Sequence, residues 1–198
     1  MPKIVNKDEK INFICDEAYN VFVNAGIDDF SLNKFISDIK MSKGQFYHYF
    51  STKEQLIYQV MSRQTSRLME KQLESYNTKE SFIDKISAIF RIYLNQEKYY
   101  SDLRKLYIDT LHIYITSKDD EIKEFNHSLY QTIFHLLKTI FEEEIKKGYF
   151  RQDSIFLAKS ICATADGMFL QSLMIENFDL KTELSNYFLE IEKLVKIN

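Results

Sequence analysis

The chain has 198 residues with 45% hydrophobic content, which is enough for a packed core in one large or two small domains and excludes general disorder. One Pro and four Gly are too few for the many turns of a strand-rich fold, so an all-α fold is expected. The formal net charge of -3 means that any surface for nucleic acid must be local.

The first elements are predicted from helix-ending and helix-starting signals. After an irregular arm over residues 1–8, an apolar stripe is followed by Gly26, which is placed to act as the left-handed cap of the first helix. A serine followed three residues later by a Glu or Gln predicts a capping box at the start of a helix. Three further helix starts are predicted at Ser31, at Ser42 with Gln45, and at Ser51 with Glu54.

The segment 31–53 reads SLNKFISDIKMSKGQFYHYFSTK and contains two short helical patterns separated by a very short break. In the second pattern Phe46 and Phe50 form the inward pair, and the polar and aromatic residues between them point elsewhere. Two tightly joined helices, the second with such a surface, are typical of a helix-turn-helix that reads DNA.

A long helix over about 52–76 should lead away from these three short helices. Downstream, helices are expected over about 82–93, 102–116, 120–147, 154–176 and 181–196, with Gly148 closing one of them and Asp153 capping the next. Because no flexible linker interrupts the pattern, the domain boundary is placed inside the long helix. The predicted domains are 8–60 and 61–198.

The motif MSKGQFYHYFSTKEQLI, preceded by SLNKFISDI, resembles the TetR family of bacterial transcriptional regulators, and residues 8–60 carry most of this resemblance. Farther on, KKGYFRQD and LAKSICATADGMFLQSL agree with the family in outline. The resemblance implies an N-terminal three-helix helix-turn-helix domain joined through a long helix to a C-terminal dimerisation and ligand-binding domain. It also implies a homodimeric repressor that binds a double-stranded, inverted-repeat operator and is released by a small-molecule effector.

Several residues are candidates for the DNA face. Gln45 could bind adenine or serve only in the capping box, and Lys43 could reach a guanine, a phosphate or solvent. Lys53 or Ser31 could hold a phosphate at a helix N-terminus. The resemblance adds phosphate and base-edge contacts for two aromatic residues. The predicted DNA-binding set is Ser31, Ser42, Lys43, Gly44, Gln45, Tyr47, His48, Tyr49 and Lys53.

The charge of residues 1–50 departs from the basic footprint expected of a DNA-binding module. Six lysines stand against seven acidic residues, and there is no arginine. However, Lys40, Lys43 and Lys53 surround the expected recognition helix, and no acid lies between residues 39 and 50. A locally positive surface and salt-sensitive DNA binding are therefore expected.

The C-terminal half is expected to form a self-complementary four-helix interface between two copies, although packing within one copy would also explain its apolar stripes. The residues concerned are Ile122, Phe125, Leu129, Ile133, Leu136, Leu137, Ile140, Phe141, Ile161, Ala165, Met168, Phe169, Ser172 and Leu173. By resemblance, the helices over about 80–137 surround an effector cavity, and an aromatic lining suits an aromatic or lipophilic molecule. The candidate lining residues are Phe90, Tyr93, Tyr107, Tyr114 and Phe134.

Two rival functions remain open at this stage. Asp109 with His112 and Glu124 with His127 each place a carboxylate and an imidazole one helical turn apart, as in metal-binding helical bundles. A helical protein-interaction module without DNA binding is the second alternative. No catalytic motif is evident, so no enzyme, cofactor or metal is predicted.

The remaining sequence features indicate the cellular compartment of the protein. The absence of an apolar run of about 20 residues and of a signal-peptide block predicts a cytoplasmic protein without a membrane partner. Cys15 and Cys162 match no metal or redox spacing and are expected to be reduced and mostly buried.

Overall fold

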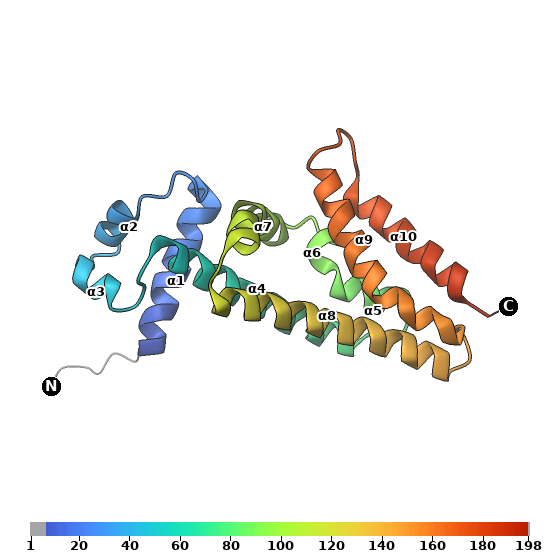
Figure 1. The fold of residues 1–198 in the computed structure, drawn as a ribbon. Helices are drawn as coiled ribbons and strands as arrows, with labels where there is room; N and C mark the ends of the chain where they lie inside the picture. The colour runs from blue at the N-terminus through green and yellow to red at the C-terminus, as the bar shows by residue number, and fades with distance from the viewer. Residues whose placement is uncertain (1–6, 198) are drawn as a thin grey trace. The chain divides into compact units, whose positions relative to one another are not determined.

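The structure is a computed structural model that describes residues 7–197, and no β-strand forms among them. The predicted all-α fold is therefore confirmed (Figure 1). Of the arm expected over residues 1–8, residues 1–6 lie outside the described part, while the first helix already begins at Lys7. No helix in the described range is long and apolar enough to cross a membrane.

The chain packs as two compact units. The N-terminal unit extends to Arg67 and includes Asp102–Lys123, whereas the C-terminal unit combines Leu68–Ser101 with the chain from Glu124 onwards. The N-terminal unit thus recruits a segment from far along the sequence, which no local pattern indicates. The functional division at residues 60 and 61 stays a prediction.

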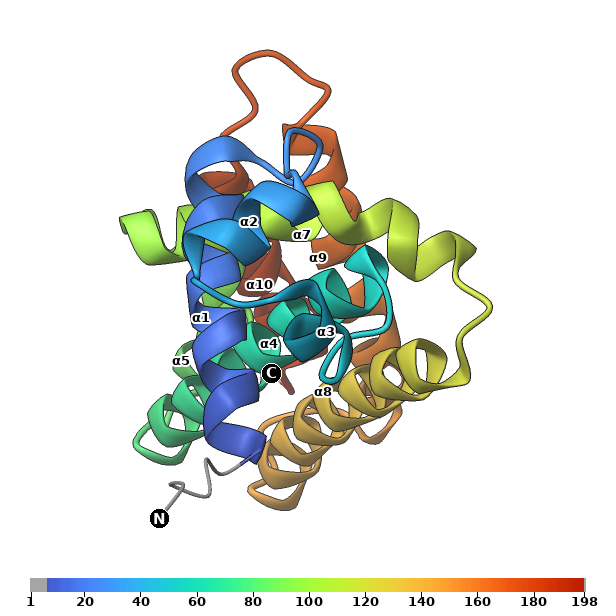
Figure 2. The same cartoon turned by 90° about the vertical axis from the view of Figure 1, so that its left-hand side faces the viewer.

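The N-terminal unit is built around phenylalanines on the inner faces of its helices. Phe22, Phe46 and Phe50 are at most 1% exposed, and Leu106 joins the same core from the recruited segment. Figure 2 shows the first three helices of the chain close to one another. The helices that contribute are α1 (Lys7–Ala25), α2 (Leu32–Asp38), α3 (Lys43–Tyr47), the first part of α4 (Lys53–Asn77), most of α7 (Lys98–Thr116) and the start of α8 (Asp120–Lys146).

The predicted helix ends are confirmed at three places and wrong at a fourth. Gly26 has φ +83° and donates its N–H to the Phe22 carbonyl at 2.9 Å, which ends α1 as expected. Ser31 and Ser42 cap α2 and α3. The box expected from Ser51 and Glu54 does not form.

The start of α4 is shifted by one residue from the predicted box. The Thr52 hydroxyl accepts the Gln55 N–H at 3.0 Å, and the Gln55 side-chain oxygen accepts the Ser51 N–H at 2.6 Å. Thr52 and Gln55 have the same spacing as Ser51 and Glu54, one position later, so the sequence contains two possible helix starts. The backbone adopts the second of them.

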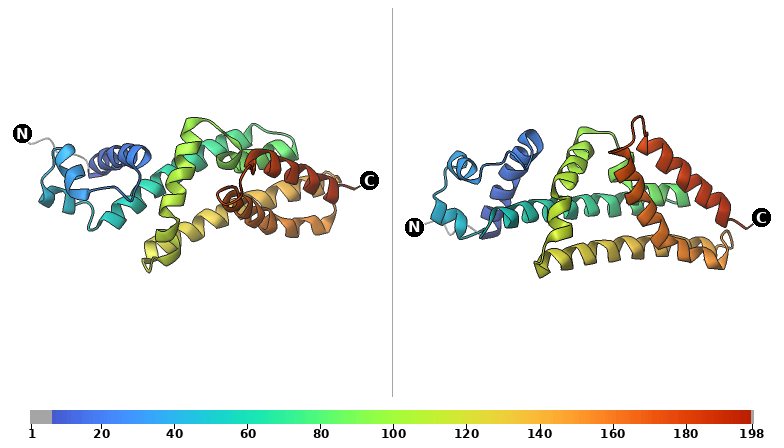
Figure 3. Two further views of the ribbon diagram at one scale, coloured as in Figure 1. Left: turned by 90° about the horizontal axis from the view of Figure 1, so that it is seen from above. Right: turned by 45° about the horizontal axis from the view of Figure 1, so that its top comes forward.

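The C-terminal unit has its own core, in which α10 packs on α5, α6 and α9 (Figure 3). The expected helix over 82–93 breaks at Phe90, whose ψ of +21° ends one helix and precedes the next. Asp153 caps no helix, because a short 3-10 turn intervenes between α8 and α9. The remaining elements are α5 (Phe82–Ile89), α6 (Arg91–Leu94), the 3-10 helix η1 (Gln152–Phe156), α9 (Leu157–Ser172) and α10 (Leu180–Val195).

Much of the predicted dimer interface lies inside this core, so the expectation is wrong for those residues. The side chains concerned are at most 2% exposed and pack within one chain, since they face α5 and α10 of the same unit. They are Leu137, Ile140, Phe141, Ile161, Ala165 and Phe169. Leu173 of the same set is 48% exposed and remains available to a second copy.

Candidate nucleic-acid interface

Helices α2 and α3 form a helix-turn-helix whose two members are held by buried side chains. Phe35 and Ile36 of α2 are each 3% exposed, and Phe46 of α3 is fully buried. The Phe46 ring lies 5.5 Å from the Phe50 ring, just beyond the end of α3. This packing fixes the inner face of α3 and leaves its other faces toward solvent.

The turn between the two helices is a Schellman motif with a lysine in the left-handed position. Lys40 has φ +55°, its N–H is bonded to the Ser37 carbonyl at 3.0 Å, and the Met41 N–H is bonded to the Ile36 carbonyl at 3.1 Å. Glycine normally occupies this position because a Cβ atom is strained there. The chain instead places an exposed positive charge beside α3.

Replacing Lys40 by glycine is expected to raise the free energy of unfolding by about 1 kcal/mol, since the left-handed strain disappears. The same change is expected to weaken DNA binding and to lessen its salt dependence, because one positive charge is lost. Chemical unfolding and DNA titration at two salt concentrations measure the two effects. Lys40→Asn, which tolerates the left-handed region but also lacks the charge, is the matched control.

A reciprocal capping box starts α3 and engages one of the predicted DNA-reading residues. The Ser42 hydroxyl accepts the Gln45 N–H at 3.2 Å, and the Gln45 side-chain oxygen accepts the Ser42 N–H at 2.9 Å. A bidentate contact to adenine needs both the oxygen and the amide nitrogen of glutamine. Gln45 is exposed, but its side-chain oxygen is already bonded within the helix start.

The other predicted DNA residues on and after α3 share one exposed surface. Lys43, Gly44 and His48 are exposed, and Tyr47 is 48% exposed beside the buried Phe46. Tyr49 is half-buried, with its ring centre 5.1 Å from that of His48. The structure thus brings most of the predicted set together on one side of the unit.

Lys53, at the first position of α4, is engaged within the protein. Its ammonium donates to the carbonyls of Ile27 at 3.3 Å and Phe30 at 3.1 Å, and it lies 5.5 Å from the centre of the Phe30 ring. These bonds tie the loop between α1 and α2 to the start of α4. The lysine side chain therefore has a structural role, which sequence reasoning missed because its partners lie more than 20 residues away.

The five predicted effector residues are divided between the two units. Tyr107 and Tyr114 pack against the core of the N-terminal unit, and burial raises the pKa of the Tyr114 hydroxyl well above its ordinary value. Phe90 is buried in the C-terminal core, Tyr93 packs against that core, and Phe134 lines a hollow of about 490 Å³ between α8 and the η1–α9 segment.

A half-buried polar cluster in the C-terminal unit was not found by the sequence analysis. The Asp166 carboxylate of α9 accepts hydrogen bonds from the hydroxyls of Tyr93 at 2.7 Å and Tyr130 at 3.0 Å. Phe169 stacks on Tyr93 with ring centres 5.0 Å apart. Burial raises the pKa of Asp166, and the two tyrosine bonds oppose this shift in part.

Asp166→Asn is expected to increase stability at pH 7, because the fold then buries a neutral acceptor in place of a charge. A raised pKa in the folded state means that the acid costs stability above its folded pKa and ceases to do so as pH falls toward its unfolded pKa. The advantage of Asn should therefore shrink as pH falls toward 4. Urea unfolding of both proteins at pH 7 and near pH 4 tests this, and an advantage independent of pH would contradict it.

The metal-binding alternative gains no support. Asp109 and His112 belong to the N-terminal unit, whereas Glu124 and His127 belong to the C-terminal unit. Over residues 7–197, no three His, Cys, Asp or Glu side chains are grouped so that they could hold a metal ion. Both cysteines are free and buried, and burial raises the pKa of the Cys15 thiol to about 11.

The helix-turn-helix also identifies the chain's relatives. Residues 14–60, which span α2, α3 and their supporting helices, match the profile of bacterial regulatory proteins of the tetR family. Over this region the chain is similar to the DNA-binding part of that family. Comparison with curated protein sequences found no match.

Solved structures are similar to this chain in fold over nearly its whole length, including the C-terminal unit. A transcriptional regulator from Saccharomonospora viridis, in complex with choline, has a TM-score of 0.78 at 15% identity and covers 96% of this chain and 100% of its own. A TetR-family regulator from Cytophaga hutchinsonii has a TM-score of 0.77 at 16% identity, with 99% of each chain covered. A TetR transcription regulator from Haloarcula marismortui has a TM-score of 0.78 at 12% identity, and the match covers 96% of this chain and 100% of the other.

Proposed function

We propose that this protein is a homodimeric transcriptional repressor of the TetR family, without enzymatic activity, that binds a double-stranded inverted-repeat operator and is released by a small molecule. The observation that carries the proposal is the exposed surface of α3. Lys43, Gln45, Tyr47 and His48 face solvent, while Phe46 anchors the helix from behind. A polar and aromatic face on a firmly held helix is suited to the major groove.

The electrostatics of this surface support salt-sensitive binding. Lys40 and Lys43 lie in the turn and at the start of α3, and the nearest acid before them is Asp38 at the end of α2. Phosphates can also be bound by the N-terminal amides of α2 and α4, since helix N-termini favour anions. Because Lys53 is held by two carbonyls, the α4 contact is assigned to backbone amides.

Dimerisation is assigned to the outward side of α9 and the residues that follow it. Leu170, Leu173 and Met174 are 39%, 48% and 76% exposed, and Ala163 lies exposed on the same helix. Apolar side chains on this scale are usually covered by a partner. An isologous contact through this side would pair two recognition helices, as an inverted-repeat operator requires.

The effector is assigned to the C-terminal unit and to the class of aromatic or lipophilic molecules, including cations. The choline complex of the Saccharomonospora viridis protein supports a ligand in this fold. In this chain, the Asp166 carboxylate among Tyr93, Tyr130 and Phe169 offers a charge and aromatic rings for a cation. Ligand binding would favour a conformation with lower operator affinity. Because operator DNA lies in the cytoplasm of bacterial cells, we assign the proposed action to the cytoplasm.

A DNA titration tests the proposal. The purified protein is mixed with labelled DNA from upstream of its own gene, at rising salt and with an excess of unrelated competitor DNA. Saturable, competitor-resistant binding that weakens with salt is expected. If that DNA does not bind, selection of bound fragments from the whole genome follows, and failure to enrich any sequence would refute the assigned function.

A further inference from the structure

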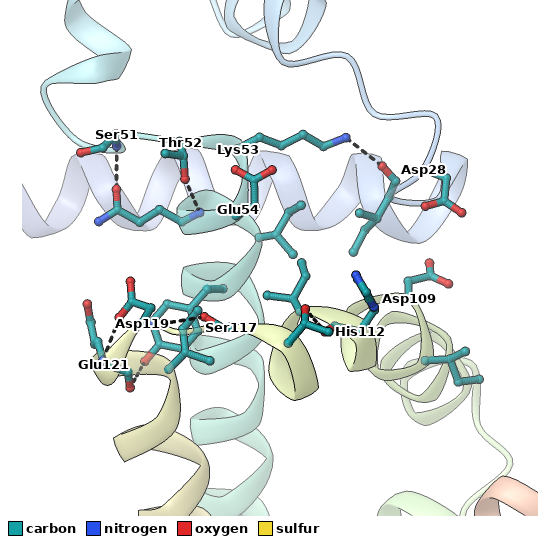
Figure 4. Close-up of a pocket in the computed structure, with 18 residues that line it drawn as sticks. Asp28, Ser51, Thr52, Lys53, Glu54, Asp109, His112, Ser117, Asp119 and Glu121 are labelled. Atoms are coloured by element: carbon teal, nitrogen blue, oxygen red, sulfur yellow. Dashed lines mark hydrogen bonds between the residues drawn. The ribbon is translucent and has the colours of Figure 1, made fainter.

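The N-terminal unit contains a second potential ligand site, a hollow of about 1110 Å³ on the side of α4. Its walls come from the loop after α1, the first turns of α4, the last turns of α7, and the α7–α8 connection with the start of α8 (Figure 4). A volume near 1,000 Å³ is sufficient for a small organic molecule.

The lining combines an apolar floor with acidic ends. Isoleucines from all the surrounding segments, among them Ile57, Ile108 and Ile122, contribute the apolar part. Figure 4 shows Asp28 and Asp109 on one side of the hollow, and Asp119 and Glu121 on the other. A molecule that is apolar in the middle and positively charged at both ends would match this distribution.

The acidic groups of the hollow outnumber its cations. Five carboxylates line it, those of Asp28, Glu54, Asp109, Asp119 and Glu121, against the one ammonium of Lys53, which is bonded to two backbone carbonyls and keeps its charge. Among residues 7–197, no hydrogen bond or ion pair engages the side-chain carboxylates of Asp28, Glu54 or Asp109. The field of several carboxylates in a concave, partly apolar site concentrates cations.

At the other end, the acidic groups are held in place by neutral donors. The Asp119 carboxylate accepts the Glu121 N–H at 2.8 Å, and the Glu121 carboxylate accepts the Gln59 side-chain amide at 3.3 Å. The Tyr58 hydroxyl also donates to the Glu121 carbonyl at 3.3 Å. The first two bonds hold the carboxylates without cancelling their charge, and the third holds the Glu121 backbone. Binding of an ammonium would therefore cost little further ordering of these side chains.

We infer that this hollow binds an organic dication, with an ammonium group at each end of an apolar chain, as in a long-chain α,ω-diamine. One ammonium is held by Asp28 and Asp109, and the other by Asp119 and Glu121. The methylene chain lies on the isoleucines. This site is separate from the effector cluster around Asp166, which belongs to the C-terminal unit.

The position of the hollow connects such a ligand to the DNA face. Its walls include Ile27, whose carbonyl is bound by Lys53, and the first turn of α4, which is the next helix after α3. A ligand that binds differently to two arrangements of these segments changes the affinity for DNA by the same factor as DNA changes the affinity for the ligand. This coupling rests on the proposed function, whereas binding of the dication does not.

Isothermal titration of the full-length protein with octamethylenediamine tests the site directly. Saturable binding at one site per chain is expected, with octylamine binding more weakly and the neutral diol showing no saturable heat. Asp109→Asn and Glu121→Gln, one from each end, should each weaken diamine binding by about tenfold or more, because a charged contact is lost. Thermal melting of each variant confirms that it is folded.

Glu17→Gln is the matched control, since it removes one negative charge from an exposed position of α1 in the same unit. Diamine affinity should change by less than about twofold in this variant, because distant exposed charges are screened. The inference is overturned if wild-type protein shows no saturable binding, if the diol binds as tightly as the diamine, or if all three variants weaken binding equally.

Adding the diamine to the DNA titration distinguishes the two proposals. Diamine binding without any operator binding would refute the proposed function and retain the ligand site. Operator binding without diamine binding would refute the ligand site and retain the proposed function. A change of operator affinity that is absent in Asp109→Asn and retained in Glu17→Gln supports the coupling, and an equal change in both would contradict it.

Discussion

Replacing Phe46 by alanine is expected to unfold the N-terminal unit or leave it barely stable. Phe46 is fully buried and packs with Phe50, so its removal leaves a large cavity at the centre of the helix-turn-helix. Such a change costs about 3–5 kcal/mol, a large part of the roughly 5–15 kcal/mol that stabilises a domain. Urea unfolding followed by far-ultraviolet circular dichroism measures the loss, since the chain has no tryptophan.

The adjacent Tyr47 provides the matched control for this experiment. It is an aromatic residue on the same short helix, but its side chain is 48% exposed. Tyr47→Ala should change the free energy of unfolding by no more than about 0.5 kcal/mol, as is usual for surface positions. Equal destabilisation by the two substitutions would mean that α3 is not oriented as described.

Replacing Tyr47 and His48 together by alanine is expected to lower operator affinity by about 100-fold, which corresponds to roughly 2.7 kcal/mol, while leaving the fold intact. The physical reason is that both side chains lie on the exposed part of the helix-turn-helix and have no part in its buried core. Fluorescence anisotropy with a labelled operator, at fixed salt concentration, provides the measurement.

Tyr149→Ala serves as the control for operator binding. Tyr149 is also a large exposed aromatic residue, at 57% exposure, but it belongs to the C-terminal unit. Its substitution should leave operator affinity unchanged within about twofold. If the double variant bound the operator as tightly as the wild-type protein, the DNA face would have to be assigned to another surface.

The local sequence was sufficient to predict the helix-turn-helix, because the residues that determine it lie close together in the chain. The box of Ser42 and Gln45, the left-handed Gly26 and the inward Phe46 each act within one helical turn, so periodicity and capping residues identify them. Where two capping signals compete, as at Ser51 and Thr52, the sequence alone does not determine at which residue the helix starts. In the structure the capping bonds come from Thr52 and Gln55.

The C-terminal unit shows the opposite case, in which apolar periodicity predicts helices but not what covers them. Ile161, Ala165 and Phe169 fit a dimer interface as well as a core, and only the presence of α10 beside α9 decides for the core. Hydrophobic burial has no direction, so a stripe does not specify its partner.

What the sequence alone determined is the all-α fold, most helix boundaries and the solvent-facing residues of α3, since these depend on neighbours three or four positions away. Tertiary structure decided the rest. The packing of the helices places Asp166 beside Tyr93, which is 73 residues away in the sequence. It also places Lys53 within hydrogen-bond distance of the carbonyls of Ile27 and Phe30. These contacts depend on how whole helices pack, and a hydrogen bond between distant residues leaves no regular spacing in the chain.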